Sequence, residues 1–562
     1  MTTADPAVIR IGPARITAGL DRYARLDLAA HLNVFGPAPH LAATDLIEMC
    51  EQVDLRGRGG AAFPVARKLR AVLDRTTARR RAAVVVNGTE GEPGSSKDKT
   101  LLARSPHLVL DGAVLAADAL QATEIVVAVA GSGPQAESVV QAVAADGALS
   151  RITRVVRVPD RFVSGEGGAL INAINGQPAL PPGTKVLPSD SGVRGRPTLL
   201  SNAETFAQIA VLARLGPAGY ASAGIEGEPG TVLLTVGGSV AQTTVVETPT
   251  GMPLGHILDL CSAEPPRAVL VGGYHGMWIS PEVACDLPVG RSSLAAAGGA
   301  LGAGVVLVLG RKTCPLAEVA RVAAFMAAQS SGQCGPCMRG LPAVARSLAA
   351  LAAGSGGPDE LEAARGTAAG VRGRGACAHP NGTANFVGSA LDVFADDVAE
   401  HMFRGTCGQR TAGILPLTDA APHGRLTVDW TRCEGHGLCA RLAPELIRLD
   451  AGGYPEILDV PVPFWLSKHA AQAVEMCPAL ALKLTRPPVA KTARLPSAGP
   501  APAAIAGPAD YRERGARQPP DGDGADRDGP PTLTGRAMRR AELDEASAWL
   551  YEISGSRRTL RG

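Results

Sequence analysis

The sequence predicts a multidomain protein of α/β and α+β class. Its 562 residues exceed the usual size of one domain, and 46% of them are hydrophobic, which is enough for several cores. Between residues 82 and 158, short apolar runs alternate with helical patterns, as in a parallel sheet with helices on both faces. Residues 315–403 are rich in alanine and have helical periodicity, which predicts a small helical bundle.

Charge and hydropathy exclude several classes of protein. The formal net charge is only +2, so nothing in the overall charge indicates a nucleic-acid partner. The N-terminus has neither a basic nor an apolar stretch, so no signal peptide is expected. The longest uncharged stretch, residues 292–310, contains five glycines and suits a turn and a buried strand rather than a transmembrane segment. We expect a cytoplasmic protein, either free or peripheral to a membrane complex.

The eleven cysteines are an odd number and lie mainly in the C-terminal half. Their spacing there is typical of metal sites and argues against a secreted disulfide framework. Cys50, Cys261 and Cys285 lie in apolar or loop contexts and are expected to be inert.

A glycine-rich turn comes directly before a helical pattern at residues 65–74. Gly57, Gly59 and Gly60 let backbone N–H groups approach a ligand closely, and Arg58 adds a positive charge. The following helix contributes its positive N-terminal end, so a phosphate is the expected occupant. A tight structural turn is the alternative, because the spacing is not G-x-G-x-x-G and no clear strand precedes it.

A second polar loop follows the apolar run 82–86, which reads as a buried strand. It contains Asn87, Glu90 and Glu92, at the strand end where open α/β sheets bind ligands. A solvated acidic turn is the alternative.

Together, residues 56–64 and 87–94 resemble the FMN-binding flavoprotein component of respiratory complex I (the F-subunit of NADH-quinone oxidoreductase) and its relatives in NAD-linked hydrogenases and formate dehydrogenases. That family carries G-R-G-G-A-G-F followed by N-A-D-E-x-E-P-G. Here Ala62 replaces a glycine and Thr89 replaces the aspartate.

The resemblance continues at residues 161–172, where the family has Y-x-C-G-E-E-T-A-L-x-x-S. Gly165 and Glu166 match, whereas Gly167 replaces a glutamate that binds NADH in the family. Residues 195–205 resemble G-x-P-T-x-x-N-N-V-E-T. Asn202 keeps one flavin-contacting asparagine, and Ser201 replaces the other. The resemblance implies a Rossmann-like FMN-binding domain over residues 42–215, behind an N-terminal leader of residues 1–41.

The resemblance also implies roles for single residues. Ala71 and Leu187 stand where relatives place aromatic residues that stack on the dinucleotide. The implied ligands are Gly57, Arg58, Gly59, Gly60 and Lys68 for the FMN phosphate and ribityl chain, Asn87, Glu90, Gly165, Glu166 and Asn202 around the flavin, and Glu92 and Phe63 facing the nicotinamide of NADH.

Residues 228–310 change to short β-rich runs with glycine-rich turns. They resemble the ubiquitin-like β-grasp domain of the same family. The predicted elements are strands at 231–236, 244–248, 268–271 and 305–309 and a helix at 256–262.

Residues 315–405 are predicted to be a helical iron–sulfur domain, with helices at 317–328, 341–353, 358–369 and 387–403. The family pattern S-C-G-x-C-x-x-C with one distant cysteine holds a [4Fe–4S] cluster. Cys334, Cys337 and Cys377 match three of its ligands, and Ser331 takes the first ligand position. A serine-ligated [4Fe–4S] cluster, a three-iron cluster and no stable cluster all remain open. Cys314 and Cys407 are candidate replacement ligands, and a zinc half-site is the alternative for Cys334 and Cys337.

Residues 408–423 are predicted to be a linker to a second cysteine-containing module at residues 424–486. Cys433, Cys439 and Cys477-Pro478 resemble the pattern of single-cluster ferredoxins that serve actinobacterial cytochromes P450. His436 stands at the position of the missing cysteine. Three thiolates fit a [3Fe–4S] cluster, histidine ligation would give [4Fe–4S], and a solvent-facing His436 is the simpler alternative. Residues 487–562 are predicted to be mostly disordered, with a possible helix at 535–553.

The resemblance implies an NADH dehydrogenase-type oxidoreductase. Electrons would pass from NADH to FMN, to the cluster at Cys334, to the ferredoxin cluster and then to an acceptor such as a cytochrome P450, a membrane reductase or a component of a respiratory complex. An FMN and iron–sulfur relay that does not use NADH is one alternative. A non-catalytic assembly scaffold with a working ferredoxin module is the other.

Overall fold

The computed structural model describes residues 6–131, 133–183, 186–418, 425–444, 446–457, 462 and 466–485. The predicted disordered tail and its helix at 535–553 lie outside these residues. No helix in the described part of the chain combines the length and hydropathy needed to cross a membrane.

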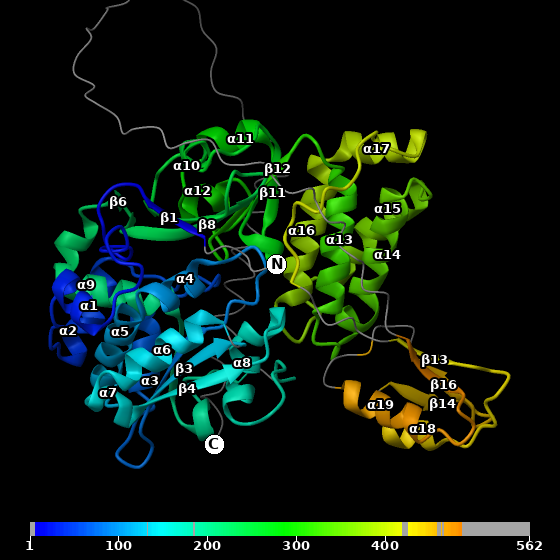
Figure 1. Cartoon of the computed structure of the whole chain (residues 1–562), viewed down its shortest axis with the longest axis horizontal. Helices are drawn as coiled ribbons and strands as arrows, with labels where there is room; N and C mark the ends of the chain where they lie inside the picture. The colour runs from blue at the N-terminus through cyan, green and yellow to red at the C-terminus, as the bar shows by residue number, and fades with distance from the viewer. Residues whose placement is uncertain are drawn as a thin grey trace, which may run out of the picture. The chain divides into compact units, whose positions relative to one another are not determined.

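A four-stranded parallel sheet with strand order β4-β3-β2-β5 lies at the centre of the first domain (Figure 1). Valine and alanine fill both of its faces. Val84 and Val86 pack into the core with helices α5 (Pro106–Ala119) and α9 (Ala203–Ala221), whereas Val85 packs with α8 (Gly167–Ile174). The predicted parallel α/β arrangement is confirmed. The strands are β2 (Ala83–Gly88), β3 (Glu124–Ala130), β4 (Thr153–Val158) and β5 (Thr198–Asn202).

The helix predicted at 65–74 is present as α3, and α5 and α6 are the helical patterns between the strands. The sequence pattern did not indicate four further helices, α1, α4, α7 and α9. The helices are α1 (Leu28–Phe35), α2 (Ala43–Gln52), α3 (Val65–Leu73), α4 (Lys97–Arg104), α5 (Pro106–Ala119), α6 (Pro134–Ala144), α7 (Gly147–Ile152), α8 (Gly167–Ile174) and α9 (Ala203–Ala221).

A six-stranded mixed sheet with order β1-β9-β8-β12-β10-β11 forms a second layer of structure. The four strands predicted between residues 231 and 309 are confirmed, and so is the short helix. The N-terminal strand β1 joins this sheet by pairing in parallel with β9. The elements are β1 (Ala7–Arg10), β8 (Thr231–Gly238), β9 (Thr244–Pro249), β10 (Pro266–Val271), β11 (Met277–Ile279) and β12 (Val305–Gly310), helices α10 (Leu254–Leu260), α11 (Pro281–Asp286) and α12 (Arg291–Ala296), and the hairpin β6 (Gly224–Ile225) with β7 (Glu228–Pro229).

Five helices follow, and α13 to α16 lie side by side as a bundle (Figure 1). The single helix predicted at 387–403 is wrong, because the chain breaks at Phe394. Phe394 is buried, and its ring lies 5.2 Å from that of Trp278, so packing against another domain overrides the helical pattern. The helices are α13 (Pro315–Ala328), α14 (Leu341–Ala352), α15 (Pro358–Val371), α16 (His379–Val393) and α17 (Ala395–Arg404).

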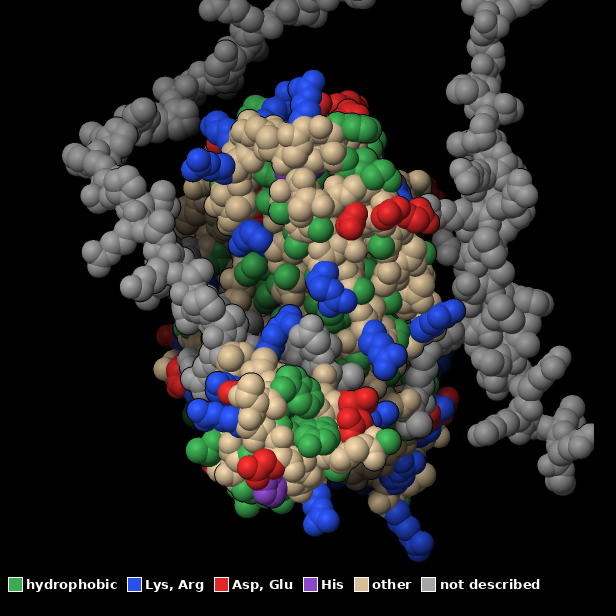
Figure 2. Space-filling model, turned by 90° about the vertical axis from the view of Figure 1, so that its right-hand side faces the viewer, with side chains coloured by type: hydrophobic (Ala, Val, Ile, Leu, Met, Phe, Trp, Pro, Cys, Tyr) green, Lys and Arg blue, Asp and Glu red, His purple; other side chains and the backbone are tan. Residues whose placement is uncertain are grey.

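The described part of the second cysteine-containing module has two small antiparallel sheets around its own core. The strands that flank the cysteines, one at each end of the module, pair with each other. The elements are β13 (Arg425–Val428), α18 (Leu438–Leu442), β14 (Ile447–Leu449), β15 (Pro455–Ile457), α19 (Ser467–Glu475) and β16 (Leu482–Thr485). Figure 2 shows Lys and Arg side chains scattered singly or in small groups over one face of the molecule, without a continuous basic patch.

Candidate functional site

The site predicted from the sequence begins where strands β2 and β5 end. These neighbouring parallel strands place Asn87 opposite Asn202 in register. The chain leaves β2 toward β3 on one side and reaches β5, on the other side, only after β4. The strand order therefore reverses between β2 and β5, and open α/β sheets bind ligands at such a point.

The glycine-rich turn lies against this edge of the sheet. The N–H of Gly57 donates to the carbonyl oxygen of Phe63 at 3.0 Å, which closes the turn. A Cβ atom on Gly59 would lie 3.2 Å from Cβ of Asn202. A side chain at position 59 would therefore fill the space between the turn and the strand end.

The last two residues of the turn, Ala62 and Phe63, differ in how well each suits its position. Ala62 has a φ of 47°, a left-handed conformation that costs an L-residue about 1–2 kcal/mol. The glycine that the family has here would avoid most of that cost. Phe63 is 42% exposed, and the guanidinium of Arg67 lies 5.4 Å from its ring, so its face is accessible for stacking.

Lys68 on α3 fits the phosphate of FMN. Its Nζ donates to the carbonyl oxygen of Leu200 at 3.1 Å. Burial lowers the pKa of its amine, and no described carboxylate forms an ion pair with it. A phosphate beside Nζ would supply the missing negative charge.

Glu90, the first carboxylate after β2, caps helix α4. It is buried and accepts hydrogen bonds from the N–H groups of Asp98 at 3.1 Å and Lys99 at 2.9 Å, and from the hydroxyl of Ser95. Burial, followed by the nearby Asp98 carboxylate, raises the pKa of Glu90. Its placement fixes the loop that the sequence assigns to the flavin.

Glu92, the second carboxylate, has a hydrogen-bond partner at only one of its two oxygens among the described residues. One oxygen accepts a hydrogen bond from the N–H of Tyr274 at 3.0 Å. The other oxygen is buried and has no partner among the described residues. Burial raises the pKa of Glu92 to about 8. A buried carboxyl oxygen without a partner is typical of a group that meets a ligand or a proton.

The loop before α8 lies beside the loop after β2. The side-chain amide of Asn87 donates to the carbonyl oxygen of Gly165 at 3.0 Å. A Cβ atom on Gly165 would lie 3.0 Å from Oγ1 of Thr89, so the two loops are in close contact. The hydroxyl of Ser164 is buried without a hydrogen-bond partner among the described residues.

Glu166 and Gly167 begin helix α8. Glu166 accepts a hydrogen bond from the N–H of Ala169 at 2.8 Å and so caps the helix. Its charge is also close enough to contribute, after burial, to the raised pKa of Cys377. At Gly167 a Cβ atom would meet only Leu200, at 3.9 Å, so this position has room for a side chain.

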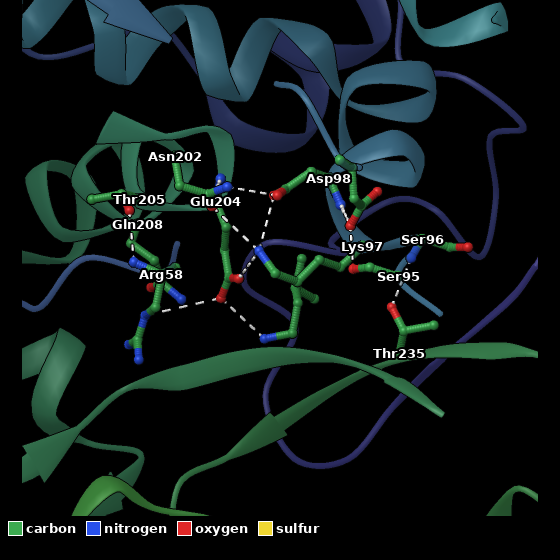
Figure 3. Close-up of polar contacts among 12 residues, drawn as sticks. Arg58, Ser95, Ser96, Lys97, Asp98, Asn202, Glu204, Thr205, Gln208 and Thr235 are labelled. Atoms are coloured by element: carbon green, nitrogen blue, oxygen red, sulfur yellow. Dashed lines mark hydrogen bonds and ion pairs between the residues drawn. The ribbon is translucent and has the colours of Figure 1, made fainter. Parts of the chain in front are cut away.

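A buried network joins this domain to the six-stranded sheet (Figure 3). Nζ of Lys97 lies 3.0 Å from Oδ1 of Asp98 and 2.9 Å from Oε2 of Glu204. Burial alone would lower the pKa of Lys97, but the two carboxylates outweigh it and raise that pKa. Glu204 also accepts a hydrogen bond from the N–H of Leu233 on β8, at 3.0 Å.

Arg58, expected at the phosphate, takes part in this network with its side chain (Figure 3). Its guanidinium lies 3.9 Å from Glu204 and donates to the carbonyl oxygen of Thr231 at 3.3 Å. Its backbone N–H donates to Thr205 at 2.9 Å. The lining of the adjacent cavity includes Arg56, Arg58, Lys97 and Arg291 together with Glu204, and each of these cations already has a carboxylate partner.

Ser331, Cys334, Cys337 and Cys377 come together in the helical domain. Oγ of Ser331 lies 4.0 Å from Sγ of Cys337, and both residues are buried. Burial, followed by the neighbouring Cys334 and then Cys377, raises the pKa of Cys337 to about 12. Among the described residues, the three thiols do not all lie within 4.8 Å of one another.

The cysteine group adjoins the flavin loop. The ring of Phe162 lies 5.4 Å from that of His379 and 4.8 Å from that of His275. Nε2 of His275 and Nδ1 of His379 are 3.1 Å apart. Because His379 follows Cys377 by two residues and Phe162 precedes Gly165, these rings connect the two predicted redox sites.

Cys314 and Cys407 do not replace the first cluster ligand. Their Sγ atoms form a separate group with a nitrogen of His401, with all three ligand atoms within 4.8 Å of one another. The sequence suggested these two residues as substitutes for Ser331, and the structure places them elsewhere.

The ligand residues of the second module line one pocket, which contains Cys433, His436, Cys439 and Cys477. Burial raises the pKa of Cys439, and the thiols of Cys477 and Cys433 add to the shift. Sγ of Cys477 accepts a hydrogen bond from the N–H of Ala481 at 3.4 Å. The side chain of His436 is 44% exposed, with Nε2 3.8 Å from Glu434. Its position therefore suits either a ligand or a surface residue.

The sequence analysis missed Lys97, His275 and His379. Lys97 belongs to no motif, and its burial depends on Glu204, which lies 107 positions later in the sequence. The two histidines follow no metal-ligand spacing, and only the tertiary structure brings their rings together.

Three family models match the chain in the order of these domains. They are the Nuo51 FMN-binding domain over residues 50–211, the NADH-ubiquinone oxidoreductase-F iron-sulfur binding region over 317–401 and a 4Fe-4S single cluster domain over 426–484. The second range contains Cys334, Cys337 and Cys377, and the third contains Cys433, Cys439 and Cys477.

Similar proteins agree with these matches. The NADH-quinone oxidoreductase F-subunit 2 of Rhizobium meliloti (strain 1021) is 28% identical over 381 residues, which cover 65% of this chain and 90% of the relative. The corresponding F-subunit of Streptomyces coelicolor is 28% identical over 383 residues, covering 65% and 85%. A solved NAD+-reducing [NiFe]-hydrogenase in the air-oxidized state has a TM-score of 0.61 at 28% identity, over 70% of this chain and 68% of that chain.

Proposed function

Because this chain is a homologue of the NADH-quinone oxidoreductase F-subunit with an FMN-binding domain and two iron–sulfur regions, we propose that it oxidises NADH and transfers the electrons through iron–sulfur clusters. FMN, when bound, accepts a hydride as two electrons and releases them one at a time. The observation that carries the proposal is the packing of Phe162, in the loop before α8, beside His379, which follows the candidate ligand Cys377 by two residues.

Residues of the first domain are proposed to hold FMN. The turn of Gly57, Gly59 and Gly60 with Lys68 takes the phosphate, because it combines an open backbone with a buried cation. The flavin ring lies at the strand ends and adjoining loops, bounded by Asn87, Glu90, Gly165, Glu166 and Asn202.

The nicotinamide side of the site is proposed to consist of Phe63 and Glu92. Phe63 offers an exposed ring face, and Glu92 offers a buried carboxyl oxygen that the protein leaves without a partner among the described residues. Gly167, Ala71 and Leu187 remove contacts that relatives make to NADH, so NADH should bind more weakly here.

The ferredoxin module is proposed to be the exit for electrons. Its acceptor is a further protein, with components of respiratory or hydrogenase complexes as one class and a cytochrome P450 or membrane reductase as others. In both clusters the chain offers three cysteines and one weaker ligand, Ser331 or His436, so three-iron clusters are proposed beside [4Fe–4S] clusters.

Anaerobic purification followed by flavin and iron analysis and by NADH titration tests the proposal. We expect about one FMN per chain, bleached by NADH. Bleaching by a reduced carrier protein but not by saturating NADH would favour a relay, as the changes at Gly167, Ala71 and Leu187 allow. A chain that binds no flavin, and iron only in the ferredoxin module, would indicate a scaffold.

The variant Gly167→Glu tests the NADH step in isolation. The position has room for a side chain, and one charge-assisted hydrogen bond contributes about 1.5–3 kcal/mol, so NADH should bind at least about tenfold more tightly. FMN content should not change. The matched control is Gly147→Glu on the exposed start of α7, where a Cβ atom meets nothing within 4 Å.

A further inference from the structure

Cys314, His401 and Cys407 form a side-chain cluster that the redox path does not use. One ligand atom from each residue lies within 4.8 Å of the other two. Sγ of Cys314 is 3.4 Å from Nε2 of His401. Cys314 and His401 are buried, each 2% exposed, and Cys407 is partly buried.

Secondary structure positions these side chains before any ion binds. Cys314 is the N-cap of α13, where its Sγ accepts a hydrogen bond from the N–H of Ala317 at 3.4 Å. His401 lies in the last turn of α17, and Cys407 follows shortly after that helix. Nδ1 of His401 is buried and has no hydrogen-bond partner among the described residues. The His401 ring therefore points Nε2 toward the thiol of Cys314 while its other nitrogen, Nδ1, makes no hydrogen bond among the described residues.

We propose that Cys314, His401 and Cys407 bind one zinc ion as a Cys2His site, separate from the iron–sulfur clusters. Two thiolates and an imidazole are ligands that zinc prefers, and zinc sites are tetrahedral. Zn–S and Zn–N bonds of about 2.3 and 2.0–2.1 Å at a tetrahedral angle place neighbouring S and N atoms about 3.6 Å apart. The observed 3.4 Å between Cys314 and His401 agrees with that geometry.

The size of the cluster distinguishes it from the iron–sulfur site. Its three ligand atoms are close enough to share a single ion, whereas the group at Cys334, Cys337 and Cys377 does not meet the same 4.8 Å limit among the described residues. With three protein ligands, water takes the fourth position of the zinc, on the partly exposed side at Cys407.

The ion would fasten the segment after α17 to the start of α13. The N–H of Cys314 donates to the carbonyl oxygen of Arg410 at 3.2 Å. The buried carboxylate of Glu318 accepts from the N–H groups of Gly413 at 2.6 Å and Ile414 at 3.1 Å. The segment from Cys407 to Ile414 leads in sequence to the ferredoxin module. Zinc would add a coordinate link between α13 and the segment after α17, beside the hydrogen bonds already present.

Metal analysis of the anaerobically purified full-length chain, grown with added zinc, tests the proposal. We expect about one zinc per chain in addition to iron, and a zinc K-edge spectrum with two sulfur ligands at about 2.3 Å and two nitrogen or oxygen ligands at about 2.0–2.1 Å. This measurement needs no variant, and iron does not contribute to the zinc edge.

Two variants locate the ion. Cys407→Ala, in the segment outside the helices, should lose the zinc and keep the iron. The control Cys334→Ser should lose iron and keep the zinc. A second control, Cys261→Ala, changes a buried cysteine that belongs to a different hydrophobic core from Cys314 and Cys337 and should keep both metals.

Three results would overturn the proposal. They are the absence of zinc after supplementation, zinc that disappears in Cys334→Ser but not in Cys407→Ala, and a Cys314–Cys407 disulfide found by mass spectrometry of the unreduced chain. None of these results bears on FMN or on NADH bleaching, so the redox function stands or falls separately.

Discussion

Replacing Lys97 by methionine tests how the flavin domain is attached to the six-stranded sheet. The change removes a cation that lies 3.0 Å from Asp98 and 2.9 Å from Glu204, in a side chain that is 2% exposed. Methionine nearly preserves the volume, so the main effect is to leave two buried carboxylates without their shared partner.

The structure gives an expected magnitude. At an effective dielectric constant of 20, each contact contributes roughly 5–6 kcal/mol of attraction, most of which offsets desolvation, and loss of one buried partner costs about 3–5 kcal/mol. Each carboxylate keeps one hydrogen bond, from Asn202 Nδ2 to Asp98 at 2.6 Å and from the N–H of Leu233 to Glu204 at 3.0 Å, and the guanidinium of Arg58 stays 3.9 Å from Glu204. We therefore expect the lower end of that range, about 3 kcal/mol.

Hydrogen exchange followed by mass spectrometry is the suitable assay, because a multidomain chain does not unfold in two states. Peptides that cover α4 and β8 should exchange on the order of 100-fold faster in Lys97→Met. The control is Lys312→Met, which removes an ion pair with Glu264 at 3.2 Å from a lysine that is 86% exposed. Surface pairs contribute about 0–1 kcal/mol, so this variant should change little.

A double-mutant cycle with Glu204→Gln completes the test. Both single changes disrupt the same Lys97–Glu204 interaction. The stability lost in the double variant should therefore be smaller than the sum of the two single losses by at least about 1.5 kcal/mol. A cost below about 1 kcal/mol for Lys97→Met, or additive effects in the cycle, would refute the view that the ion pairs of Lys97 stabilise this network.

Gly59→Asp should abolish FMN binding, because a side chain at position 59 fills the space beside Asn202. The control Gly147→Asp, at the open start of α7, should keep the flavin, and flavin absorbance after gel filtration distinguishes the two variants. Ser331→Cys should yield a four-thiolate [4Fe–4S] cluster that loses iron more slowly in air, and unchanged iron loss and electron paramagnetic resonance would contradict Ser331 as the ligand position. The pKa of Glu92 is about 8 in the folded chain against 4.5 in the unfolded chain. Between these pH values the folded chain keeps the carboxyl of Glu92 protonated and the unfolded chain does not, so the stability of the folded chain falls as the pH rises from 4.5 to 8. Glu92→Gln should remove this contribution to the slope of Tm against pH, measured from pH 5 to 8. Ala62→Gly should raise stability by about 0.5–1 kcal/mol, because glycine adopts the left-handed conformation of this position without strain. A lower Tm would show that alanine is not strained in this turn.

The sequence predicted those parts of the fold and site that depend on local patterns. Apolar runs and polar residues at strand ends predicted the edge of the sheet where Asn87 and Asn202 are now found in register. What it could not predict depends on partners far along the chain. The break at Phe394 reflects packing against Trp278, and the burial of Lys97 reflects Glu204.

The metal ligands show the same division. Cys334 and Cys337 belong to a compact motif, so their chemistry could be predicted before their geometry was known. Cys314 and His401 are 87 positions apart, and no local spacing connects them. Their meeting depends on how α13 packs with α17, which periodicity alone does not determine.

The pairing of β1 with β9 has a consequence for the order of folding during synthesis. The whole flavin domain lies between these two strands in the sequence, so it is an insertion within the six-stranded sheet. The first strand to leave the ribosome can take its place only after β9 has emerged. Until then Glu247, which is fully buried and accepts from the N–H groups of Ile16 at 2.8 Å and Thr17 at 2.9 Å, lacks those partners. The N-terminal strand therefore stays unpaired until the whole sequence of the flavin domain and the strand β9 have been synthesised.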